Sequence, residues 1–168
     1  MYVLGIDPGI GRTGWGIVGH QGQKVVALGF GCIETPPSQP HEQRLAMLFE
    51  AVRNVIASFQ PASVGVEKLF FYRNVNGIAV GEARGVALLA CAQAGLAVHE
   101  YAPPEVKQAV VGVGRADKKQ VTTMVQRILA LPKPPTPDDT ADALAIALCE
   151  LHSQPFYAAV RQSGRPSI

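Results

Sequence analysis

Three strand-like segments at the start of the chain, separated only by turns, constrain its fold most. Residues 2–6 form a short apolar run that stops at Asp7, and the following Pro8 and Gly9 are typical of a turn. Residues 14–18 and 24–33 have the composition of two more strands, and Gly22 supplies the turn between them. The pattern therefore predicts an antiparallel meander of three strands.

The rest of the chain alternates between helical and strand patterns. Apolar residues recur every three or four positions from His41 to Phe59, which predicts an amphipathic helix. Six further elements are expected: strands at 64–66 and 97–101, and helices at 78–94, 103–111, 117–130 and 138–152. This order predicts an α/β fold with one mixed five-stranded sheet flanked by helices.

Length and composition favour one compact domain. The chain has 168 residues, so we expect a single domain over residues 1–152 and a flexible C-terminal tail over 153–168. A hydrophobic content of 48% and a charged content of 17% exclude a disordered tail or a coiled coil. No apolar run is long enough to span a membrane. The three cysteines lack metal-ligand spacing and predict reduced thiols and a cytoplasmic location.

Two carboxylates stand directly at predicted strand ends. Asp7 follows the first strand and Glu67 follows the fourth. In α/β sheets such strand ends face the functional crevice. Each residue also has a simpler interpretation, because Asp7 can cap its turn and Glu67 can be a solvated charge.

The last predicted helix carries acids at its start, and one of them needs a partner. Asp138 and Asp139 suit the first turn of a helix, where acids favour the helix dipole. Asp142 lies beyond that turn and precedes the apolar stretch 143–149, so we expect it to be buried. An unpaired buried carboxylate costs several kcal/mol or protonates. No Lys or Arg lies at helical spacing to pair with Asp142.

A divalent cation would supply the missing charge. Carboxylate oxygens are the ligands that Mg²⁺ prefers, and two-metal sites hydrolyse phosphodiesters with little else from the protein. We therefore expect Asp7, Glu67, Asp139 and Asp142 to be the catalytic, metal-binding residues. The expected cofactor is Mg²⁺, two ions per site, for which Mn²⁺ can substitute.

At this point the residues resemble the RuvC family of Holliday-junction resolvases. The similar motifs are Gly5-Ile-Asp-Pro-Gly9 with Thr13-Gly14, Val66-Glu67, Gly81-Glu-Ala-Arg-Gly85, Glu105 to Gly112 and Asp142-Ala-Leu-Ala-Ile-Ala147. The resemblance implies an RNase H-like fold and a homodimer that cuts two like strands of a four-way DNA junction symmetrically. It also implies branch-migration proteins RuvA and RuvB as partners. Asp138 leaves the third acid ambiguous by one position, and the Asp-x-x-Asp spacing favours Asp139.

The resemblance further implies a DNA-binding surface. Phe70 is expected to stack on bases near the crossover, and Arg73 and Asn74 to touch the backbone. The basic residues expected near the scissile phosphate or the DNA backbone are Lys107, Lys118, Lys119 and Arg115. For one of the two adjacent lysines a solvated helix face is the simpler interpretation.

Two other functions stay open from the residues alone. One is an RNase H-like nuclease that acts on another nucleic acid. The other is an ATPase of the actin and Hsp70 type, whose phosphate loop also contains Gly-Ile-Asp-x-Gly, although that fold needs two such domains. The net charge of +2 does not by itself indicate a nucleic-acid partner.

Overall fold

The computed structural model describes residues 1–68 and 77–162 and contains one mixed sheet. Its strands are β1 (Tyr2–Asp7), β2 (Arg12–Gln21), β3 (Lys24–Glu34), β4 (Ser63–Glu67) and β5 (Ala97–Tyr101), in the spatial order β3-β2-β1-β4-β5. The first three pair antiparallel, and β4 and β5 extend the sheet from β1 in parallel. The predicted meander and the predicted five-stranded mixed sheet are confirmed.

The helices are α1 (His41–Phe59), α2 (Gly77–Gln93), α3 (Pro103–Val111), α4 (Lys118–Ile128) and α5 (Asp138–Gln162). All five were expected, but α5 was predicted to end at residue 152 and to be followed by a flexible tail. That boundary is wrong, because the helix continues through Gln162. Tertiary contacts hold the added turns: the Tyr157 ring stacks on His99 with centroids 3.7 Å apart, and Gln154 Nε2 donates to Ser63 Oγ at 2.9 Å.

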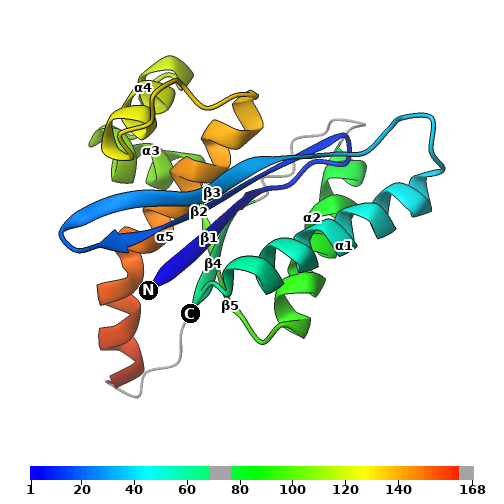
Figure 1. The fold of residues 1–168 in the computed structure, drawn as a ribbon, viewed down its shortest axis with the longest axis horizontal. Coiled ribbons are helices and arrows are strands. Elements are labelled where there is room, and N and C mark those ends of the chain that lie inside the picture. Colours follow the sequence, from blue (N-terminus) through cyan, green and yellow to red (C-terminus); the bar gives the residue numbers. More distant parts are fainter. Residues whose placement is uncertain (69–76, 163–168) are drawn as a thin grey trace.

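The helices cover both faces of the sheet, with α1 and α2 on one side and α3, α4 and α5 on the other (Figure 1). Side chains alternate along β1, so Leu4 and Ile6 pack into the core with α1 and α2, whereas Val3 packs into the core with α5. The same alternation directs Asp7 to the α5 face of the sheet.

Glycines let α5 lie unusually close to the strands. A Cβ atom on Gly5 would lie 2.2 Å from the carbonyl oxygen of Ala143, and one on Gly14 would lie 1.8 Å from that of Asp139. No side chain larger than hydrogen fits at either position while the helix stays in place. The glycines that accompany Asp7 in the sequence therefore seat the helix that carries the other acids.

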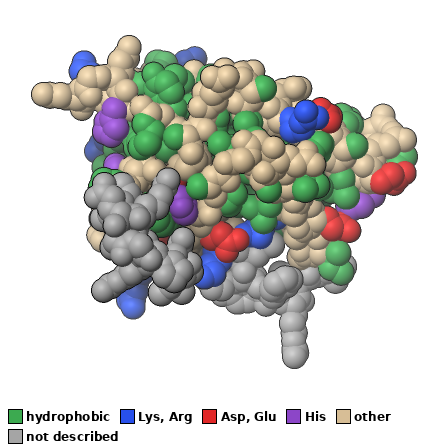
Figure 2. Space-filling view, turned by 90° about the horizontal axis from the view of Figure 1, so that it is seen from below, with side chains coloured by type: hydrophobic (Ala, Val, Ile, Leu, Met, Phe, Trp, Pro, Cys, Tyr) green, Lys and Arg blue, Asp and Glu red, His purple; other side chains and the backbone are tan. Residues whose placement is uncertain are grey.

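Two surface properties agree with the composition. Among the described residues no helix is long and apolar enough to cross a membrane. Basic and acidic side chains are scattered over the face drawn in Figure 2 rather than gathered in one field of a single sign.

The three cysteines are free, with Cys91 and Cys149 buried and Cys32 half-buried.

Candidate active site

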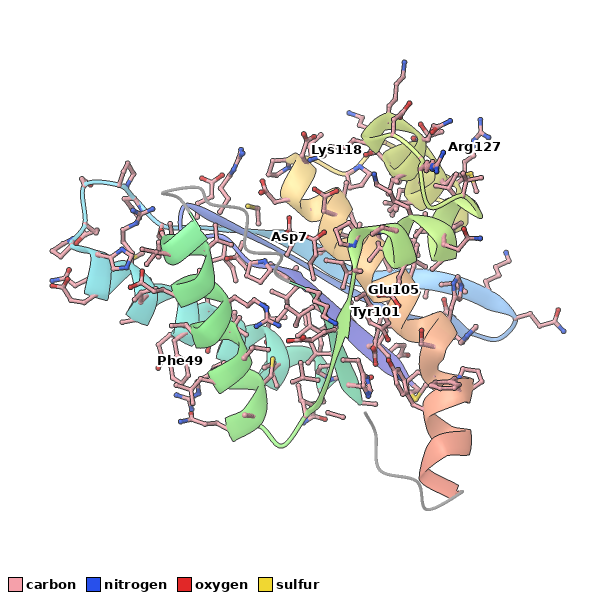
Figure 3. All side chains as sticks on the ribbon, turned by 180° about the vertical axis from the view of Figure 1, so that it is seen from behind. Asp7, Phe49, Tyr101, Glu105, Lys118 and Arg127 are labelled. Atoms are coloured by element: carbon pink, nitrogen blue, oxygen red, sulfur yellow. The ribbon has the colours of Figure 1, made fainter. Side chains whose placement is uncertain are left out.

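The two strand-end carboxylates lie side by side at one edge of the sheet. Strands β1 and β4 are parallel, and Ile6 pairs with Val66, so Asp7 and Glu67 leave their strands together. Val66 packs into the core beneath α1 and α2, whereas Gly65 faces α5. The alternation of side chains therefore directs Glu67, like Asp7, to the α5 face. Figure 3 shows Asp7 where the end of its strand meets α5.

The first turns of α5 bring the acids of the helix to the same edge. Exposed fractions of their side chains distinguish them: 75% for Asp138, 25% for Asp139 and 36% for Asp142. Asp142 is thus half-buried rather than fully buried as expected. Its partner is Lys118, whose Nζ lies 2.9 Å from Asp142 Oδ2. The lysine comes from α4, so no pattern within the last helix could have predicted it.

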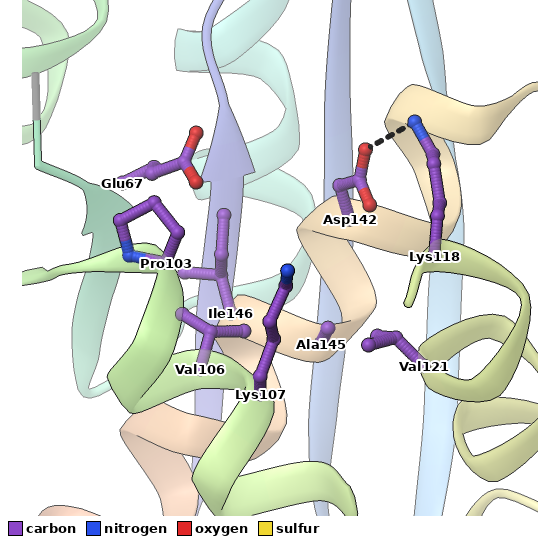
Figure 4. Close-up of a pocket in the computed structure, with 9 residues that line it drawn as sticks. All are labelled: Glu67, Pro103, Val106, Lys107, Lys118, Val121, Asp142, Ala145 and Ile146. Carbon is purple, nitrogen blue, oxygen red and sulfur yellow. Dashed lines mark ion pairs between the residues drawn. The ribbon is translucent and has the colours of Figure 1, made fainter. Parts of the chain in front are cut away.

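A hollow of about 210 Å³ lies between these groups. Its walls come from α3, α4, α5 and the end of β4, and its lining residues are Glu67, Pro103, Val106, Lys107, Lys118, Val121, Asp142, Ala145 and Ile146. In Figure 4 the Glu67 and Asp142 carboxylates stand on opposite sides of the hollow, and the Lys107 side chain points between them. The floor is apolar and the rim is charged.

Burial and neighbouring negative charges raise the proton affinity of Asp7 and Glu67. Burial, together with the charges of Asp142, Glu67 and Asp139, raises the pKa of Asp7 to about 7. Burial and the charge of Asp142 also raise the pKa of Glu67, although Lys118 and Lys107 act in the opposite direction. The four acids therefore form one electrostatic unit with an excess of negative charge.

Two cations already balance part of that charge. Burial lowers the pKa of Lys118, but its hydrogen bonds and charge attraction to Asp142 and Asp138 outweigh this effect and raise it. Arg12 places its Nε 3.1 Å from Asp139 Oδ2. Arg12 starts β2 next to the Thr13-Gly14 pair, and our sequence analysis did not single it out.

The donor set fits a hard divalent cation such as Mg²⁺, because only carboxylate oxygens are offered. In the described part of the chain, no three Asp, Glu, His or Cys side chains converge closely enough to enclose one ion. Mg²⁺ rarely needs such a cage, since it is usually bound by one or two carboxylates together with water and substrate phosphates. The arrangement suits ions that are completed by a nucleic-acid phosphate.

The predicted DNA-binding residues fall into three groups. Lys107 and Lys118 line the hollow. Lys119 lines a separate shallow groove along α4, and Arg115 is exposed in the turn before that helix. The predicted contacts Phe70, Arg73 and Asn74 lie outside the described residues.

A buried polar cluster behind the site was not predicted. Glu150 lies on α5 and is fully buried. Its carboxylate accepts a hydrogen bond from Tyr101 Oη at 2.7 Å and lies 3.0 Å from His99 Nδ1. Ser63 and Gln154 donate further hydrogen bonds to it. These partners come from β4, β5 and α5 itself. The only sequence signal was a single acid at the end of an apolar helical stretch.

Comparisons with known proteins agree with this geometry. The family described as crossover junction endodeoxyribonuclease RuvC matches residues 3–150. The crossover junction endodeoxyribonuclease RuvC of Heliobacterium modesticaldum is 51% identical over 162 residues, which are 96% of this chain and 100% of that protein. The solved Thermus thermophilus RuvC structure is 40% identical with a TM-score of 0.85, over 94% of this chain and 97% of that one. The structure of the T. thermophilus RuvC in complex with Holliday junction substrate gives a TM-score of 0.86 at 40% identity, over 93% and 96% of the two chains.

Proposed function

Because this chain belongs to the RuvC family of crossover junction endodeoxyribonucleases, we propose that its four carboxylates form a metal-dependent site that cuts two like strands of a four-way DNA junction. The chain is thus a DNA endonuclease with an RNase H-like fold. One observation carries the proposed site: the paired ends of β1 and β4 direct Asp7 and Glu67 to the α5 face, where Asp142 lines the same hollow as Glu67. The pKa of Asp7, raised to about 7 by burial and by the charges of three other carboxylates, agrees with this arrangement.

The four carboxylates would hold the metal from two sides. Asp7 and Glu67 belong to the sheet, and Asp139 and Asp142 to α5. We assign Asp139 rather than Asp138 as the third acid, because Asp139 raises the pKa of Asp7 whereas Asp138 is exposed and pairs with Lys118. Two Mg²⁺ ions per site, replaceable by Mn²⁺, would supply positive charge and Lewis acidity for phosphodiester hydrolysis.

The two lysines of the hollow complete the site. Lys107 points between Glu67 and Asp142, where its ammonium group can bind the scissile phosphate (Figure 4). Lys118 pairs with Asp142, and its charge opposes the rise in the pKa of Asp142 that burial causes. Beyond the hollow, Lys119 and Arg115 would contact the DNA backbone, and the contacts proposed for Phe70, Arg73 and Asn74 rest on the family resemblance.

A homodimer would place two such sites on one junction, and α2 offers a face for it. Gly81 and Gly85 have no neighbour within 4 Å of an added Cβ, and Ile78 and Leu89 on the same face are 74% and 52% exposed. Ala83, Ala87 and Ala90 of α2, by contrast, are buried in the core and serve internal packing. A role for RuvA and RuvB as partners follows from the family alone.

The test is cleavage of a synthetic mobile four-way junction, with each strand labelled and with Mg²⁺ and Mn²⁺ supplied in parallel. We expect symmetric pairs of nicks in two like strands. Asp7→Asn should bind the junction as tightly as the wild type but lose cleavage by about 10²–10³-fold or more, the cost of removing a preorganised charge from an active site.

A matched pair of variants distinguishes the two adjacent acids. Asp139→Asn should abolish cleavage, whereas Asp138→Asn should leave it nearly unchanged. Normal nicking by Asp7→Asn would refute the proposed site. Preferred cleavage of an RNA–DNA hybrid, or ATP hydrolysis without DNA cleavage, would instead favour one of the two alternative functions.

A further inference from the structure

Arg84, in the middle of α2, has a largely buried guanidinium group that points toward the strand ends beneath the site. Its side chain is only 15% exposed. Its Nη2 bonds the carboxylate of Glu100 on β5, and its Nε lies 3.4 Å from the main-chain carbonyl oxygen of Glu67 on β4. One side chain therefore ties a helix to the ends of two neighbouring strands.

Side-chain alternation explains why these three residues meet. Tyr101 packs on the α5 face of the sheet, so Glu100 points to the opposite face, toward α2. A buried guanidinium stays charged and needs partners, and Glu100 supplies the opposite charge. The Nε–H group of Arg84 then points to the Glu67 carbonyl oxygen.

Glu67 is consequently bound on both sides of the sheet. Its carboxylate enters the hollow on the α5 face, and its carbonyl oxygen accepts from Arg84 on the α2 face. The next residue adds a main-chain hydrogen bond, which Lys68 N donates to the Tyr101 carbonyl oxygen at 2.8 Å. Any shift of the Glu67 main chain would carry its carboxylate along, and these two hydrogen bonds oppose such a shift.

We propose that Arg84 is a positioning residue that sets the Glu67 carboxylate for metal binding by holding the Glu67 main chain and Glu100 together. The proposal rests on the proposed function of Glu67. Arg84 is not among the residues that line the hollow, and it acts through Glu67. It also connects the site to α2, the helix whose outer face is proposed to form the dimer.

The main test compares Arg84→Met with Arg84→Lys in the full chain. Arg84→Met removes the donors while keeping similar bulk, and it should weaken Mn²⁺ binding, measured with the metal alone by calorimetry, by about 10–100-fold, as is typical of residues that orient metal ligands. The single-turnover cleavage rate at saturating junction should fall by a similar factor, while junction affinity in Ca²⁺ stays within about twofold. Arg84→Lys should recover part of the Mn²⁺ affinity, because it keeps the charge opposite Glu100.

Further variants separate positioning from mere folding. Arg53→Met, which removes an exposed ion pair on α1, is the control and should change neither Mn²⁺ affinity nor cleavage. Glu100→Gln should show the same kind of loss as Arg84→Met with less effect on folding. Because Arg84 acts through Glu67, the double variant Glu67→Gln, Arg84→Met should bind Mn²⁺ no more weakly than Glu67→Gln alone.

The outcomes separate this inference from the proposed function. Wild-type Mn²⁺ affinity in folded Arg84→Met would overturn the positioning role, and so would an additive loss in the double variant. If Glu67→Gln itself left Mn²⁺ binding and cleavage unchanged, Glu67 would not be a metal ligand. The proposed site and the positioning role of Arg84 would then both be refuted.

Discussion

At the scale of single residues, Asp7 is the most informative group. It stands where three other carboxylates act on it, and burial adds to their effect, so its pKa is raised from 3.8 to about 7. The folded protein then binds a proton at Asp7 more tightly than the unfolded chain does. The contribution of Asp7 to the free energy of unfolding therefore falls as the pH rises from about 4 to about 7, and the penalty is complete above that window.

We accordingly expect Asp7→Asn to stabilise the protein in EDTA at pH 8, at about 1.4 kcal/mol per unit of pKa shift as an upper bound, and to change its stability little at pH 4. Urea unfolding at both pH values measures the difference. Glu50→Gln, at an exposed position on α1, is the control and should show no such pH dependence. If Asp7→Asn were less stable than the wild type at pH 8, the proposed repulsion of Asp7 by the other three carboxylates would be contradicted.

At the scale of elements, the contact of α5 with β2 decides where the helical acids lie. Gly14 has no side chain, and the carbonyl oxygen of Asp139 occupies the space that a Cβ would need. Arg12, on the same strand, pairs with the Asp139 carboxylate. The start of β2 thus sets both the position and the charge environment of the third acid.

Gly14→Ala should therefore push the first turn of α5 away from the sheet. We expect a loss of about 1–3 kcal/mol in the free energy of unfolding, as is usual for overpacking, and loss of junction cleavage. Arg53→Met, at an exposed position on α1, is the control and should change the unfolding free energy by less than about 1 kcal/mol and leave cleavage unchanged. If Gly14→Ala cut the junction at the wild-type rate, the close contact of α5 with β2 would not be required for cleavage.

At the scale of the whole molecule, one site can cut only one strand, so symmetric cleavage depends on association. The outer face of α2 has exposed apolar side chains and two open glycines, whereas its inner face packs against α1. Apolar side chains flanking small residues suit close contact with a second copy of the helix.

Leu89→Glu should dissociate the proposed dimer, because it places a charge on the apolar face of α2. Sedimentation velocity at micromolar concentration should then show monomer, and junction cleavage should give single nicks instead of paired ones. Leu28→Glu, at a similarly exposed position on β3, should leave the assembly unchanged. A dimer that persists in Leu89→Glu would place the interface elsewhere.

Much of this protein follows from its sequence because the patterns are local. Alternation over two residues and recurrence over three or four define the strands and helices, and glycines and prolines mark their ends. The carboxylates at strand ends were recognisable because acids are scarce in this chain. The parallel β1–β4 pairing places the ends of the two strands that carry Asp7 and Glu67 next to each other.

The tertiary structure alone decided which side chains partner those acids. Lys118 reaches Asp142 from another helix, Arg84 reaches Glu67 from the far face of the sheet, and Glu150 gathers its partners from two strands. The same kind of contact holds α5 beyond residue 152, past the boundary expected from periodicity. Such pairs join residues 17 to 87 positions apart, and their contact depends on strand order and on which face of the sheet each side chain takes. Local patterns carry no information on that order, so the position of each acid was predictable and its partner was not.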